Sequence, residues 1–202
     1  SQLIAELRQM GVDAAGMELD LSQHTAPAEL FAVVQERFGR ANILVNNAAY
    51  STSEDIYQLN AESLDNHYAV NIRGMALLCR AFVQQFTPEE WVENGRIINI
   101  SSGQSFSPMP GELAYIASKG AVEALSLSLS AELARRGITV NAIDPGITDT
   151  GWIPDELRQI FVAQAPMGRI GTPEDAARLV RFLASPEAAW ITGQLIRSRG
   201  GL

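Results

Sequence analysis

Cysteine, histidine and basic residues are scarce in this chain of 202 residues. With one cysteine and two histidines, a disulfide framework is impossible and no metal site is expected. Lys and Arg number 15 against 23 Asp and Glu, a formal net charge of -8, which argues against nucleic-acid and anionic-membrane partners because both are recognised through basic patches. No apolar run approaches the roughly 18 residues of a membrane span. These deficits favour a cytoplasmic protein with a small-molecule ligand.

What the chain does contain is a regular alternation of helices and short apolar strands. With 47% hydrophobic and 19% charged residues, residues 1–202 have the apolar content for one core and are expected to form one domain. Short Val/Ile/Leu strands between helices predict a parallel sheet covered on both faces, which is a doubly wound α/β fold. The predicted helices cover residues 3–10, 28–38, 61–85, 112–136, 154–164 and 173–183, and the predicted strands cover residues 17–21, 43–46, 96–100, 139–143 and 194–197.

Tyr115 and Lys119 form the pair with the clearest chemistry. One helical turn apart, they face the same side of the predicted helix. There the lysine ammonium can lower the pKa of the phenol, which is about 10 when free, and make Tyr115 a usable acid/base. Ser101 and Ser102 end the apolar run 97–100 and precede the tyrosine by 14 and 13 residues.

Four groups of polar or small residues lie at or just beyond the carboxyl ends of predicted strands. In open α/β sheets, ligands bind outside the carboxyl ends of the strands. We therefore expect these groups to form one binding site. They are Asp20-Leu21, Asn46 to Ala49, Ser101-Ser102 and Pro145-Gly146.

These motifs, in this order, resemble the short-chain dehydrogenase/reductase family. Beside residues 115–119, the resemblance rests on Asn46-Asn47-Ala48-Ala49, on Asn71 inside a helical pattern, and on residues 141–146, and it runs from about Met17 to Leu202. It implies a Rossmann-like fold and hydride transfer between a nicotinamide cofactor and a carbonyl or alcohol substrate.

The resemblance also implies catalytic roles. Tyr115 is the expected general acid for reduction and base for oxidation, and Lys119 is expected to hold the nicotinamide ribose as well. Ser102 is expected to hydrogen-bond the substrate oxygen because the family's serine lies thirteen residues before the tyrosine; the reverse assignment to Ser101 stays open. Asn71 resembles the asparagine that holds a water for proton relay, and its alternative is a helix-interior amide bonded to a backbone carbonyl.

Cofactor contacts follow from the same resemblance. Asp20 is expected at the adenine amino group with Leu21 beside the ring, although a turn acid at a helix start is the alternative for Asp20. The expected contacts with the adenosine ribose are Asn47, Ala48 and Ala49, and those with the nicotinamide carboxamide or phosphate are Pro145, Gly146, Ile147, Thr148 and Thr150. Ala49 stands where the family usually has glycine, a change of one methyl.

The family's glycine-rich phosphate motif is absent from this sequence. The first β-α-β unit is therefore expected to be missing from the chain, and a non-catalytic or cofactor-free family member is the alternative function. The cofactor is NADP or NAD, with NADP favoured by the resemblance alone. Small residues along the helix at 112–136 allow tight helix packing, and the resemblance implies a homotetramer, or a homodimer if the missing segment changes the assembly. His24 and His67 are expected to be ordinary surface histidines.

Overall fold

The computed structural model describes residues 2–92 and 94–201. Its sheet has four parallel strands in the order β1-β2-β3-β4. The longest strand, β3, is buried along its whole length, as expected for a strand covered on both faces. The strand bounds are β1 Ile43–Asn46, β2 Gly95–Ile100, β3 Ile138–Asp144 and β4 Leu195–Arg197.

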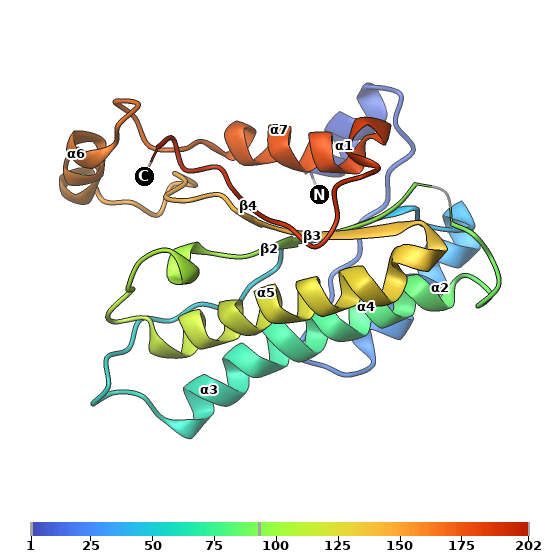
Figure 1. Ribbon diagram of the computed structural model, residues 1–202, viewed down its shortest axis with the longest axis horizontal. Coiled ribbons are helices and arrows are strands. Elements are labelled where there is room, and N and C mark those ends of the chain that lie inside the picture. The colour runs from blue at the N-terminus through green and yellow to red at the C-terminus, as the bar shows by residue number, and fades with distance from the viewer. Residues whose placement is uncertain (1, 93, 202) are drawn as a thin grey trace.

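Helices cover both faces of this sheet (Figure 1). Alternate side chains of β2 point to opposite faces, so Ile97 packs in the core cluster beneath α4 and α5, whereas Ile98 packs with Leu183 of α7. The Rossmann-like layering predicted from the sequence is confirmed. The helices are α1 Gln2–Gln9, α2 Ala26–Phe38, α3 Ala61–His67, α4 Met75–Gln84, α5 Leu113–Leu133, α6 Asp155–Gln164 and α7 Pro173–Ala184.

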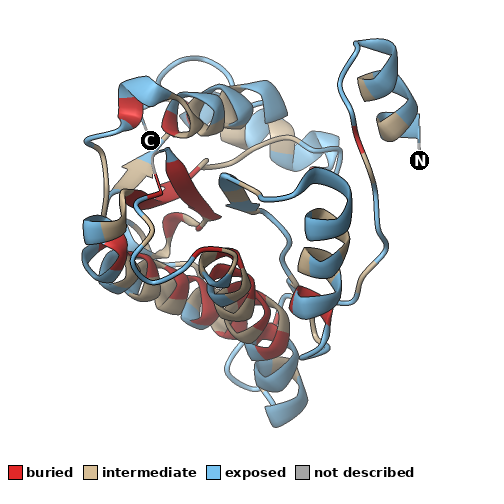
Figure 2. Cartoon of the chain, turned by 90° about the vertical axis from the view of Figure 1, so that its right-hand side faces the viewer, coloured by how far each residue is buried: buried red, intermediate tan, exposed pale blue. Residues whose placement is uncertain are grey.

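None of these described helices combines the length and the low charge that crossing a bilayer requires. The N-terminal helix α1 has no buried residue and lies at one side of the molecule (Figure 2). It is joined to α2 by a segment without regular structure.

That segment contains the strand predicted at residues 17–21, and this prediction is wrong. A strand needs a neighbour that shares its backbone hydrogen bonds, and β1 pairs only with β2 within the described residues. The segment instead packs on the helical stretch between α3 and α4, where a Cβ on Gly74 would approach the Leu21 carbonyl oxygen to 2.7 Å. Arg73 also donates to the Ser22 carbonyl oxygen. Position 74 therefore requires glycine, because the backbone of Leu21 passes too close to leave room for a side chain.

The helix predicted at residues 61–85 is present but not uniform. Between α3 and α4, residues Tyr68–Gly74 form a π-helix. Such wide turns are rare and often coincide with functional sites. Asn71 lies at the middle of this one.

Candidate functional site

The first turn of α5, which carries Tyr115, is held in place by a buried carboxylate. Glu54, in the loop after β1, accepts a hydrogen bond from the Ala114 backbone nitrogen at 2.9 Å. Its other carboxylate oxygen accepts from Thr52 Oγ1 at 2.7 Å. Because a helix start leaves backbone N–H groups without partners, this contact fixes the first turn of α5. Tyr115 is in that turn.

Lys119 lies one turn further along α5 and is almost completely buried, with 3% of its surface exposed. Its Nζ donates to the Ile100 carbonyl oxygen at 2.8 Å and lies 5.6 Å from the centroid of the Tyr115 ring. Burial disfavours the ammonium form and lowers the pKa of Lys119 to about 8. The side chain thus joins the end of β2 to the phenol.

The pKa of Tyr115 is raised above its usual value of 10.0, mainly by burial. The Ser102 hydroxyl opposes this shift by hydrogen bonding, whereas the charges of Glu112 and Asp144 add to it. Desolvation therefore outweighs the favourable contacts, and the net lowering of this pKa that was expected from the pair with Lys119 is not found.

The two adjacent serines at the end of β2 point in different directions. Ser101 is buried, and its Oγ donates to Glu123 of α5 at 2.7 Å. Ser102 lines a pocket of about 690 Å³ together with Tyr115. The choice of Ser102 by spacing agrees with this geometry, because Ser101 points away from the pocket toward Glu123.

Asn71 uses its whole side-chain amide within the protein. Its Nδ2 donates to the Tyr50 carbonyl oxygen and to Ser118 Oγ, both at 2.9 Å, and its Oδ1 accepts from the Tyr50 nitrogen at 2.7 Å. These bonds join the loop after β1, the π-helix and α5. They are the contacts of the alternative interpretation, a helix amide bonded to backbone, and they occupy the side-chain amide of Asn71.

The 690 Å³ pocket brings together residues that are far apart in the sequence. Of the predicted site residues, Ser102, Tyr115, Gly146, Ile147 and Thr148 line it. Thr150 does not line it, and Trp152 does. The rest of the wall consists of Ser51, Ser53, Gly103, Ser107, Pro108, Met109, Glu112, Asp144, Phe161 and Arg199.

The residues expected at the adenosine end lie outside this pocket. Asp20 accepts hydrogen bonds from the Ser22 nitrogen at 2.9 Å and from Gln23 Nε2 at 3.3 Å. These bonds lower the pKa of Asp20 and are those of the turn acid at a helix start. Asn47, Ala48 and Ala49 are exposed beyond the end of β1.

The ion pair between Asp144 and Arg199 in the wall of the pocket was not predicted from the sequence. Asp144, with 1% of its side chain exposed, ends β3, and Arg199 Nη1 lies 3.3 Å from its Oδ2. The other carboxylate oxygen accepts from the Gly146 nitrogen at 2.9 Å. The guanidinium also lies 5.0 Å from the centroid of the Phe106 ring. No sequence spacing links positions 55 residues apart, so only the position of Asp144 at a strand end was a usable clue.

His67 was also missed, because the prediction of a surface histidine is wrong. The ring is buried, stacks edge-on against Tyr50, and lies 6.3 Å from Tyr115 between ring centroids. Its Nδ1 is 2.7 Å from the Ser63 carbonyl oxygen. His67 therefore belongs to the packing behind Tyr115.

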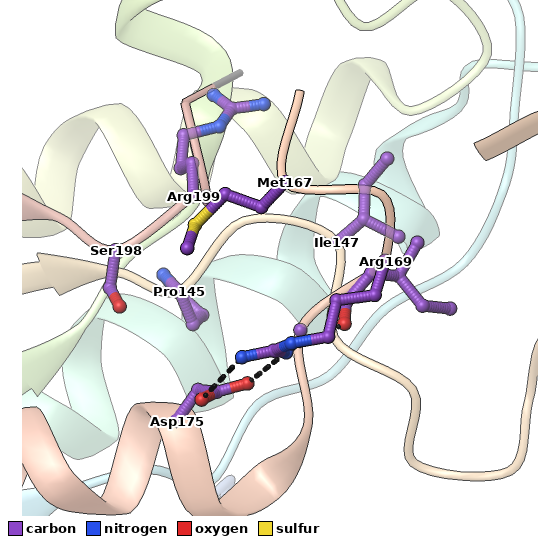
Figure 3. Close-up of a pocket in the computed structure, with 10 residues that line it drawn as sticks. Pro145, Ile147, Met167, Arg169, Asp175, Ser198 and Arg199 are labelled. Atoms are coloured by element: carbon purple, nitrogen blue, oxygen red, sulfur yellow. Dashed lines mark hydrogen bonds and ion pairs between the residues drawn. The ribbon is translucent and has the colours of Figure 1, made fainter. Parts of the chain in front are cut away.

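A smaller cavity of about 210 Å³ lies on the other side of Pro145 and Arg199 (Figure 3). Two of its charged side chains bind each other, because Arg169 donates to both carboxylate oxygens of Asp175 at 2.6 and 3.1 Å. Asp175 also caps α7. These two side chains therefore hold the segment that precedes α7 to the start of that helix.

Comparison with known proteins agrees with the fold. A family model described as enoyl-(acyl carrier protein) reductase matches residues 1–202. An uncharacterized oxidoreductase, YjdA, from Bacillus subtilis is 52% identical over 97% of this chain and 78% of its own length. The 3-oxoacyl-[acyl-carrier-protein] reductase FabG of Pseudomonas aeruginosa is 33% identical over 100% of this chain and 82% of its own.

Solved structures give the same result. A short-chain dehydrogenase/reductase from Serratia marcescens superposes with a TM-score of 0.91 at 30% identity, covering 99% of this chain and 81% of the other. The promiscuous reductase LugOII, described as catalysing keto-reduction, gives a TM-score of 0.88 at 36% identity with the same coverage. The chain belongs to the short-chain dehydrogenase/reductase family and is an oxidoreductase.

Proposed function

We propose that this protein reduces a ketone or aldehyde to an alcohol, or catalyses the reverse reaction, with NADP or NAD. The observation that carries this proposal is that the hydroxyls of Ser102 and Tyr115 line the same pocket, with Lys119 buried behind the phenol. In that arrangement two O–H donors can reach one substrate oxygen, which is where negative charge develops during reduction. We propose one domain for residues 1–202.

Each residue has a distinct part. The nicotinamide, when bound, supplies or accepts the hydride. Tyr115 gives its phenolic proton to the carbonyl oxygen during reduction and takes one from the hydroxyl during oxidation, so hydride and proton together complete the alcohol. Ser102 donates a hydrogen bond to that oxygen. The Lys119 ammonium stabilises the transient phenolate and holds the ribose, and the backbone of Asn71 holds the water that returns the proton.

The described residues fit the nicotinamide end of such a cofactor. Pro145, Gly146, Ile147 and Thr148 follow β3 directly, and a Cβ on Gly146 would lie only 3.0 Å from Arg199 Cγ, so this turn is compact. Asn47, Ala48 and Ala49 are exposed beyond β1, and we assign them to the adenosine ribose and Asp20 and Leu21 to the adenine. No glycine-rich loop for the pyrophosphate occurs in the sequence.

NADP is the cofactor we favour, and a small carbonyl or alcohol compound is the substrate class. Two relatives support reduction of a ketone, since their names describe a 3-oxoacyl reductase and a keto-reduction. A cytoplasmic location is proposed from composition alone.

The test is carbonyl reduction by purified protein, followed by the absorbance of NADPH or NADH. Turnover with a ketone is expected, and S102A should lower kcat by about 10²-fold because it removes one donor to the developing oxyanion. S101A is the matched control and should retain turnover, since Ser101 Oγ faces Glu123. Equal losses in both variants would contradict the assignment. No turnover with either cofactor, together with no cofactor binding by calorimetry, would favour the alternative function.

We also propose assembly through α5. Ala117, Gly120, Ala121 and Ala124 recur at helical spacing, and Leu127 follows with 62% of its surface exposed. A Cβ on Gly120 would meet nothing within 4 Å, so this stripe is open and small side chains allow two helices to approach closely. Sedimentation at micromolar concentration should give a dimer or tetramer, and a stable monomer would contradict the proposal.

A further inference from the structure

The charges in the wall of the 690 Å³ pocket do not balance. Three charged residues line it: Glu112, Asp144 and Arg199. Asp144 and Arg199 pair with each other at 3.3 Å. Within residues 2–92 and 94–201, no hydrogen bond or ion pair reaches the carboxylate of Glu112. One negative charge in the wall is therefore left without a protein partner.

The position of Glu112 is fixed by its neighbours. It immediately precedes α5, and its backbone forms a parallel bridge with Glu54. The carboxylate that caps the helix belongs to Glu54, through the Ala114 nitrogen. Glu112 is thus free of the structural duty that an acid at a helix start usually has, and it is only half-buried at the pocket.

Glu112 is also electrostatically coupled to the reaction centre. Burial and the nearby charge of Glu54 raise the pKa of Glu112 above its usual value of 4.5. Its own charge helps to raise the pKa of Tyr115, three residues further on. A carboxylate in this position gains stability from any positive group that enters the pocket.

The rest of the wall suits an organic molecule of moderate size. Met109, Trp152 and Phe161 supply apolar surface, and the volume of about 690 Å³ lies in the range of small-molecule sites. The nearest cations are already engaged, Arg199 by Asp144 and Lys119 by the Ile100 carbonyl oxygen. A carboxylate or phosphate on the substrate would find no free counter-charge here.

We propose that Glu112 is a specificity-determining residue that selects carbonyl or alcohol substrates bearing an ammonium group, and that the pocket rejects their anionic counterparts. This inference rests on the proposed function. An ammonium beside Glu112 also neutralises one of the two carboxylates that hold the pKa of Tyr115 high. The preferred substrate therefore makes the phenolate easier to form.

The test uses three ketones of the same shape and different charge: 4-(aminomethyl)acetophenone, 4-methylacetophenone and 4-acetylbenzoate. At pH 8 and low salt, kcat/KM should be about tenfold higher for the ammonium compound than for the carboxylate, because opposite charges attract strongly in a partly buried site. E112Q should bring this ratio close to one. The control is E132Q, which removes an equal charge from α5 about 30 Å away and should keep the ratio.

Binding separates this inference from the proposed function. If none of the three ketones turns over with either cofactor, the proposed function fails, but the inference is still tested by titrating each compound against the fluorescence of Trp152, with W152F to assign the signal. Tighter binding of the ammonium compound that is lost in E112Q supports the inference. Equal binding of the three compounds, or a preference that survives in E112Q, overturns it.

Discussion

Replacing Tyr115 by phenylalanine is expected to lower kcat for ketone reduction by about 10³-fold or more. Y115F removes the only group in the proposed mechanism that transfers a proton to the substrate oxygen. It keeps the ring that packs near His67 and Lys119. The free energy of unfolding, measured in urea, should therefore change little, and a loss of turnover can be assigned to chemistry.

The matched control is Y57F. Tyr57 is 94% exposed, so removing its hydroxyl should leave both kcat and stability as they are. The pH dependence of alcohol oxidation gives a second readout, because the raised pKa of Tyr115 predicts a rate that rises as pH approaches this pKa and the phenol begins to lose its proton. Turnover by Y115F within tenfold of the parent protein would contradict the role of Tyr115.

Replacing Arg199 by methionine is expected to lower the free energy of unfolding by about 3 kcal/mol, because it leaves Asp144 buried and unpaired. R199M should also raise the pKa of Tyr115 further, since the charge of Asp144 already disfavours the phenolate and would then be uncompensated. The midpoint of the pH profile for alcohol oxidation should therefore move to higher pH.

Two further variants isolate the ion pair. R197M is the matched control, because Arg197 stacks on the same Phe106 ring at 5.0 Å but has no carboxylate partner in the described residues. The double variant D144N/R199M removes both charges and should recover most of the lost stability and the lower pH midpoint. A double variant as unstable as R199M, or a stable R199M, would show that the pair does not control the site.

Most of the fold could be predicted because strands and helices follow local hydrophobic periodicity. β2 and α7, for example, begin and end within one residue of the predicted bounds. The strand predicted at residues 17–21 failed because an apolar run becomes a strand only beside a partner, and pairing is not visible in a single segment. The π-helix at 68–74 has the same apolar spacing as an α-helix to within one residue, so periodicity could not reveal it.

The parts of the site that could be predicted are those whose geometry follows from short spacings in the sequence. Tyr115 and Lys119 share a helix face, and Ser102 and Gly146 each lie two residues beyond the ends of neighbouring strands. Electrostatics were not predictable in the same way. The pKa of Tyr115 depends on burial and on Asp144, and the partner of Asp144 lies in the C-terminal segment. Such contributions to a pKa arise only when segments distant in the sequence pack together.

The π-helix makes the length of this segment critical. A π-helical turn holds about one residue more than an α-helical turn, so deleting one residue between Tyr68 and Gly74 would restore a regular helix with α3 and α4 close to their present orientation. Phe82 and Cys79 would stay buried on one side of α4, but the backbone hydrogen bonds around Asn71 would change from the wide to the regular pattern. Descendants of this protein can change the residues of this segment more easily than their number, so relatives should align across it without gaps.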